Sequence, residues 1–149
     1  MSTITTLNTS DSGATSRVTI NTNFTNLNTD KVEKTTTDTL TNKRVSKRVL
    51  ALSGNSATPT INTDNYDVVN ITSQTAAITS FTTNLTGTQV AGDTLRISVT
   101  GTASVALTFG ASFEASTVAL PTTTSGTTRL DMGFFWNIVT SKWRIVATA

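Results

Sequence analysis

The pattern of apolar and polar positions divides the chain into a polar N-terminal part and a strand-forming C-terminal part. From Val45 to Ala149, short runs of alternating apolar and polar residues are separated by turn-forming residues. This is the pattern of half-buried β-strands, and almost no helical periodicity interrupts it. The sequence therefore predicts a mainly β protein, with a jelly-roll-like antiparallel β-sandwich of roughly eight strands over residues 45–149.

Two pairs of these runs predict β-hairpins. Leu95–Val99 and Val105–Phe109 both alternate, and a Thr-Gly-Thr turn signal lies between them. Thr128–Val139 and Trp143–Val146 flank a second turn signal and are rich in aromatic and β-branched residues. The second hairpin is therefore expected to supply much of the core.

The N-terminal part predicts an arm followed by a stalk. Residues 1–16 are small and polar, so they are expected to form an extended docking arm that cannot fold alone. Ser16 is a predicted N-cap, and Ile20, Phe24 and Leu27 follow at spacings of four and three, which place them on one helical face. Residues 17–44 are therefore predicted to be a short helical stalk and linker.

The stalk helix is expected to be marginal alone, because Asn and Thr, which are poor helix formers, separate its apolar residues. Contact with the same stripe on neighbouring chains would stabilise it. Ile20, Phe24 and Leu27 are thus candidate subunit contacts. The alternative is that the helix packs on the β-domain of its own chain.

Composition adds a neutral surface with one basic cluster. Thr makes up about a quarter of the chain, while charged residues make up only 13%. Lys43, Arg44, Lys47 and Arg48 lie within six positions. They are interpreted as a solvated charge run, with contact to an acidic partner surface as the alternative. No aromatic residue lies nearby to stack on bases, so no nucleic-acid partner is expected.

The sequence lacks the residues that several classes of function require. The chain has no Cys and no His, which excludes thiol nucleophiles, a histidine general base and the usual zinc ligand sets. No apolar run approaches membrane-spanning length, and Met1–Ser16 is not patterned as a signal peptide, so we expect no membrane partner and synthesis in the cytoplasm. There is no Gly-rich phosphate loop. No enzymatic activity and no cofactor are therefore expected.

Two side-chain clusters still require an interpretation. Oxygen ligands gather at Asp64–Asp67, but without EF-hand spacing, so a turn is favoured over a calcium site. A glycosidase would need two carboxyl groups facing a sugar, and a hydrolase is the weakest hypothesis. Alternation places Phe134 and Trp136 on one face of a strand and Phe135 on the other. Core packing and a subunit contact explain these aromatics, while Phe135 and Trp143 are the candidates for contact with a host glycan.

Several segments resemble domains that recur in the fibre and virion appendage proteins of tailed bacteriophages. These segments are VTINTNFTNLNTDKV (18–32), DTLTNK (38–43), DNYDVVNI (64–71), TAAIT (75–79), DTLRI (93–97), ALTFGASF (106–113), LPTTT (120–124) and FFWNIVTSKWRIV (134–146). The resemblance covers most of the chain in short, degenerate pieces.

The resemblance implies a homotrimer on the virion surface, with a docking N-terminal segment, a connecting stalk and a distal β-domain. The chain has neither long repeats nor an enzymatic domain, which favours a small head fibre or capsid decoration protein. Its partner would then be the major capsid protein, or a tail or connector protein, bound through the N-terminal segment. The alternative is a tail fibre or receptor-binding module that contacts host glycans.

Overall fold

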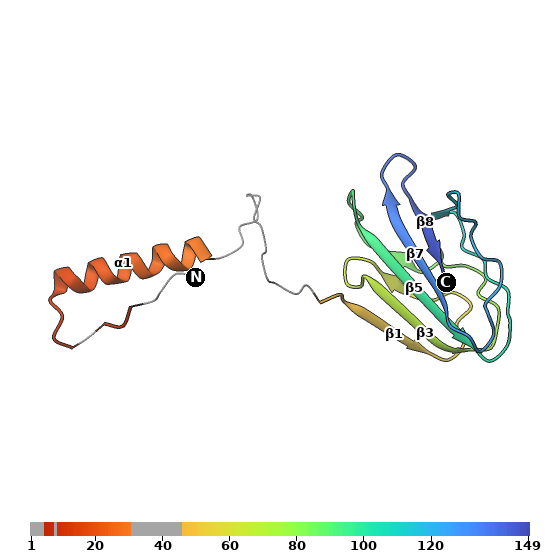
Figure 1. Ribbon diagram of the computed structural model, residues 1–149, viewed down its shortest axis with the longest axis horizontal. Coiled ribbons are helices and arrows are strands. Elements are labelled where there is room, and N and C mark those ends of the chain that lie inside the picture. The colour runs from red at the N-terminus through yellow and green to blue at the C-terminus, as the bar shows by residue number, and fades with distance from the viewer. Residues whose placement is uncertain (1–4, 8, 31–45) are drawn as a thin grey trace. The chain divides into compact units, whose positions relative to one another are not determined.

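The computed structural model describes residues 5–7, 9–30 and 46–149, with the backbone alone for residues 26–30. The chain divides into two units, Met1–Arg44 and Val45–Ala149, and each is described by itself. The prediction of a mainly β protein is confirmed, because one described helix, α1 (Gly13–Asp30), accompanies eight described strands (Figure 1). The strands are β1 (Val49–Ser53), β2 (Ile61–Asn62), β3 (Val68–Gln74), β4 (Leu85–Thr86), β5 (Thr94–Gly101), β6 (Phe113–Glu114), β7 (Leu130–Asn137) and β8 (Lys142–Thr148).

Helix α1 begins four residues earlier than the sequence predicts. The Ser12 hydroxyl accepts a hydrogen bond from the Thr15 backbone N–H at 3.2 Å, and the Ser12 carbonyl accepts one from Ser16 N–H at 2.9 Å. Ser12 is therefore the N-cap, and the prediction of Ser16 in that role is wrong. The last four residues of the predicted extended arm, Gly13 to Ser16, are helical because the Ser12 cap precedes them.

The strands of the second unit form a mixed sheet rather than an antiparallel one. The six-stranded sheet has the order β1-β3-β5-β7-β8-β6, and β2 and β4 form a separate pair. Only β5–β7 and β7–β8 are antiparallel, while the other four described pairings are parallel. The antiparallel prediction is therefore wrong for most pairings, and the jelly-roll sandwich is not confirmed. The reason is that the connections between β1, β3 and β5 return the chain to the same end of the sheet, so that each of these strands runs in the same direction.

Segments that follow one another along the chain lie side by side and run in the same direction. β1, β3 and β5 are parallel neighbours, and Val49, Val68 and Arg96 are matched across them (Figure 1). Between these strands, Ile61 of β2 is matched with Leu85 of β4 in the same parallel sense. Each pass of the chain thus supplies the backbone hydrogen-bond partners of the pass before it.

One of the two predicted hairpins is confirmed. β7 and β8 pair antiparallel, with Trp136 opposite Trp143. The other prediction is wrong, because Leu95 of β5 is opposite Phe134 of β7, and Leu107 forms a parallel bridge with Ile78. After Gly101 the chain does not fold back onto β5. It continues to Leu107, which lies beside Ile78 in the segment between β3 and β5.

The core lies on the inner face of the six-stranded sheet. Four phenylalanine rings meet there, with centroids 5.1 Å apart for Phe81 and Phe109 and 5.2 Å apart for Phe113 and Phe134. Phe134 is 2% exposed and Phe135 is 47% exposed, so the predicted alternation along this strand is confirmed. The outer face of the sheet carries Phe135 and is the face available for contacts.

Candidate functional site

Helix α1 exposes two of the three predicted subunit contacts. The Asn23 side chain binds the backbone of Thr5 twice, since its amide donates to the Thr5 carbonyl and its oxygen accepts from Thr5 N–H, both at 2.9 Å. The N-terminal segment is thereby held beside one side of the helix. Ile20 and Phe24, on the adjacent side, are 38% and 67% exposed. Leu27 lies outside the residues whose side chains the structure describes.

The exposed apolar residues of α1 do not all share one face. Val18 is also 67% exposed. At 100° per residue it lies more than 100° around the helix from both Ile20 and Phe24. Val18 is therefore a matched comparison for any role assigned to the stripe.

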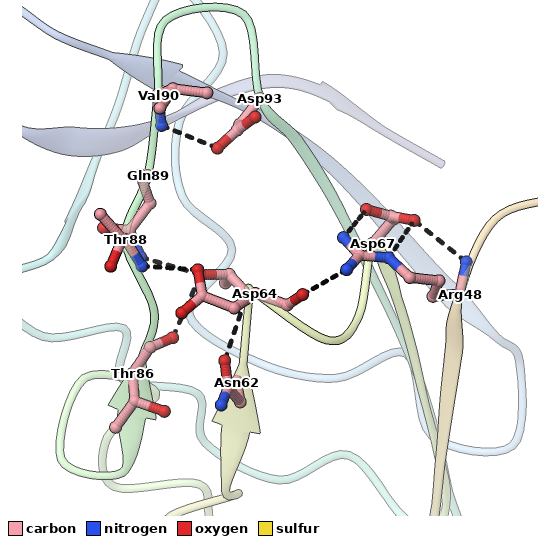
Figure 2. A network of polar contacts seen from close by, with 10 residues as sticks. Arg48, Asn62, Asp64, Asp67, Thr86, Thr88, Gln89, Val90 and Asp93 are labelled. Atoms are coloured by element: carbon pink, nitrogen blue, oxygen red, sulfur yellow. Dashed lines mark hydrogen bonds and ion pairs between the residues drawn. The ribbon is translucent and has the colours of Figure 1, made fainter. Parts of the chain in front are cut away.

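In the β-unit, Arg48 forms an ion pair with Asp67. Its Nη2 and Nε donate to the two carboxylate oxygens at 2.7 and 3.2 Å, and its backbone N–H donates to the same carboxylate at 3.0 Å (Figure 2). Its Nη1 donates to the Asp64 carbonyl. Arg48 therefore joins the start of β1 to the turn before β3. Its predicted role as a partner contact stays a prediction, because its side chain is 50% exposed and Nη1 and Nη2 each carry a second N–H donor.

The remaining residues of the basic cluster have different outcomes. Lys47 is exposed in the β-unit and stays a candidate contact. Lys43 and Arg44 lie outside the described residues. The described part of the basic cluster is thus two exposed cations, Arg48 in its ion pair with Asp67 and Lys47 immediately before it.

Asp64 and Asp93 close turns beside this ion pair. Asp64 Oδ1 accepts from Thr88 N–H at 2.7 Å, and Asp93 Oδ2 accepts from Val90 N–H at 2.8 Å (Figure 2). The Asn62 side chain accepts from Asp64 N–H at 2.9 Å, so an Asx turn begins two residues before the segment Asp64–Asp67, where the sequence favoured a turn. Among the described residues, no group of three acidic side chains is placed to hold a metal ion.

The electrostatics of Asp67 do not suit acid catalysis. Hydrogen bonds from the Arg48 side chain and backbone lower the pKa of Asp67 from 3.8 to about 2. A glycosidase general acid needs a raised pKa so that it holds a proton near neutrality. Asp67 is instead ionised at neutral pH and holds Arg48 in place.

Asp67→Asn is expected to reduce the free energy of unfolding at pH 7 by about 1 kcal/mol, the upper value for a partly exposed pair. The pKa of Asp67 is lower in the folded protein, so its stabilisation is present above pH 4, roughly, and is lost as pH falls toward about 2. Urea unfolding of both proteins at pH 7, 4 and 2 measures this. The difference should shrink at pH 2, and an undiminished difference there would contradict the assignment.

A groove of about 300 Å³ lies over the outer face of the six-stranded sheet. Phe135 is its exposed aromatic residue, and Val146, 42% exposed, lies on the neighbouring strand. The residues that line it are Lys47, Asp67, Val68, Thr94, Leu95, Arg96, Gly133, Phe134, Phe135 and Val146. Of the two predicted glycan contacts, Phe135 is therefore placed at an accessible concave surface.

Trp143, the other predicted glycan contact, is 1% exposed. Its ring packs edge-on against Trp136 with centroids 5.3 Å apart. It borders a separate cleft of about 240 Å³ beside the Arg48 network. The prediction that it presents a stacking surface is wrong, because its inward position on β8 directs it to the core.

Sequence reasoning did not select Arg96 or Gly133, which line the groove beside Phe135. The alternation of Leu95, Ile97 and Val99 already placed Arg96 on the opposite, outer face of its strand. The approach of Gly133 could not be found in the same way, because it depends on which strands are neighbours.

Comparisons of the chain with protein-family models, with curated proteins and with solved structures gave no match. Within the described residues, no helix has both the length and the apolar character needed to cross a bilayer.

Proposed function

We propose that this protein is a structural subunit of a bacteriophage virion, a homotrimeric head fibre or capsid decoration protein on the particle surface. The observation that carries the proposal is the exposed pair Ile20 and Phe24 on α1. Large apolar groups that remain exposed on a helix favour association. The trimer number and the phage origin rest on the resemblance of the chain's segments to appendage proteins.

The composition of α1 supports the same proposal. Asn and Thr occupy much of the helix, and a helix of poor formers is marginal in isolation. Burying the Ile20–Phe24 stripe against two further copies would stabilise it through association. Residues before about Leu50 would then connect the subunits and bind the capsid, tail or connector protein. The docking role of residues 1–16 is part of this proposal.

A non-enzymatic role is also part of the proposal. The carboxylates of Asp64, Asp67 and Asp93 accept hydrogen bonds from turns or from Arg48. These contacts give each acid a structural task. The lowered pKa of Asp67 favours the same view.

Phe24→Asn is expected to weaken the trimer, raising the concentration at which half the chains dissociate by about tenfold or more, as for a buried aromatic contact. Val18→Asn is the matched control, since both side chains are 67% exposed on different faces of α1. Light scattering across a concentration series measures the mass. A native protein that stays monomeric at micromolar concentration would reject the proposal, and equal effects of the two variants would reject the stripe as the contact.

A second function is favoured by the groove. Phe135 is exposed at a concave surface of the β-unit, which supports a role as a receptor-binding module that contacts host glycans. This function is compatible with a trimeric appendage. It is tested by saturable binding of the protein to host cells and by its loss in Phe135→Ala.

A further inference from the structure

The surface of the groove includes Gly133, which has no side chain, and the aromatic ring of Phe135. A Cβ added at Gly133 would meet Val146 Cγ2 at 3.8 Å and Ala147 Cβ at 3.9 Å, so a methyl-sized group fits over the glycine in ordinary van der Waals contact. Phe135 lies two residues further along β7 on the same face, opposite Thr94 of β5. A ring-shaped ligand could therefore lie over Gly133 and contact the Phe135 side chain.

The acidic side chains near this groove are already neutralised. Asp67 is bound by Arg48 through two side-chain hydrogen bonds. Asp131, which is on the outer face of β7, accepts from Arg129 Nε at 2.9 Å and from Arg129 Nη2 at 2.8 Å. Each of these two carboxylates therefore has an arginine as its hydrogen-bonded partner.

Two further cations line the groove and interact with these carboxylates only at longer range, since neither forms a direct ion pair. Arg96 lies opposite Gly133 in the sheet register, and Lys47 lies shortly before β1. Among the described residues, ion pairs within 4 Å are formed by Arg48 and Arg129, and not by Arg96 or Lys47. The groove thus combines an exposed aromatic ring with a local excess of positive charge.

From this combination we infer that the groove binds an acidic saccharide, with the sugar ring against Phe135 and its carboxylate on Arg96 and Lys47. A guanidinium binds a carboxylate through charge-assisted hydrogen bonds, which are stronger than neutral ones. The volume is at the small end of ligand sites, which suits one sugar residue of a longer chain. This inference rests on the second function proposed above and specifies its ligand class.

The probe is a trisaccharide of galacturonic acid, compared with its methyl ester, which keeps the rings and removes the charge. Titration calorimetry with the full-length protein is expected to show tighter binding of the acid, weakening as salt rises. Arg96→Gln should weaken binding of the acid by about tenfold to a hundredfold, as for loss of a hydrogen bond to a charged group. Arg17→Gln is the matched control, because Arg17 is an exposed arginine on α1 that carries the same charge.

The possible results distinguish the acidic-saccharide inference from the proposed glycan-binding function on which it rests. Equal binding of the acid and the ester would overturn the acidic ligand class and leave glycan binding in place. No binding of either, with Phe135→Ala still abolishing attachment to host cells, would overturn only the inference. No binding of either and no attachment would overturn both. An Arg96→Gln protein that changes its oligomeric mass would show that this face joins subunits, which also overturns the inference.

Discussion

Phe134→Ala is expected to lower the free energy of unfolding by about 3–5 kcal/mol, a large fraction of the stability of a typical domain. Phe134 is 2% exposed, and its ring lies 5.2 Å from that of Phe113 and 5.9 Å from that of Phe109. Truncation would leave a cavity in the aromatic cluster that joins β7 to the loops opposite it. Urea unfolding followed by tryptophan fluorescence measures the loss.

Phe135→Ala is the control for this substitution. The two residues are adjacent on β7, but Phe135 is 47% exposed on the outer face. Its replacement is expected to cost about 1 kcal/mol or less, because the ring is already about half exposed and its loss leaves no enclosed cavity. Similar losses for the two variants would contradict the assignment of inner and outer faces.

Gly101→Ala is expected to destabilise the protein by about 3 kcal/mol, at the upper end for overpacking. A Cβ at this position would lie 2.5 Å from the Gln74 carbonyl oxygen and 3.1 Å from that of Ala103. Both obstacles are backbone atoms, so no side-chain rotation relieves the clash. The end of β5 would have to move away from the end of β3, which thermal and urea unfolding would both report.

Gly133→Ala provides the comparison for Gly101→Ala. Gly133 is also a strand glycine, but its added Cβ would have no neighbour nearer than 3.8 Å. Its replacement is expected to change stability by about 0.5 kcal/mol or less. If Gly101→Ala were equally mild, the close approach of β3 and β5 at this point would be wrong.

The sequence predicted local features well where a short pattern decides them. The alternation around Phe134 and Phe135 gave the correct faces, and the turn signal before Trp143 gave the correct hairpin. Both depend on residues within about ten positions of each other. The start of α1 failed because Ser12 and Ser16 are equally good caps, and the bonds made by Ser12 decide between them.

The arrangement of the strands could not be predicted in this way. Along the chain, Val68 lies 19 positions after its partner Val49, and Arg96 lies 28 positions after Val68. Because these two spacings differ, the sequence contains no fixed repeat length that would reveal the parallel strands. An alternating strand also has the same pattern in a parallel as in an antiparallel pair. The groove shares this limit, since Arg96 and Gly133 meet only through the pairing of β5 and β7.

The place of β1 at one edge of the sheet affects how the protein behaves at high concentration. Within the described residues, no strand pairs with the outer side of β1, and Val49–Ser53 contains neither a charge nor a proline. Such an edge can recruit an extended segment of another molecule and begin aggregation. Lys47 and Arg48 immediately precede β1 and place positive charge at its N-terminal end, although Asp67 offsets part of this charge. We therefore expect the solubility of the protein to depend on Lys47 as a gatekeeper of this edge.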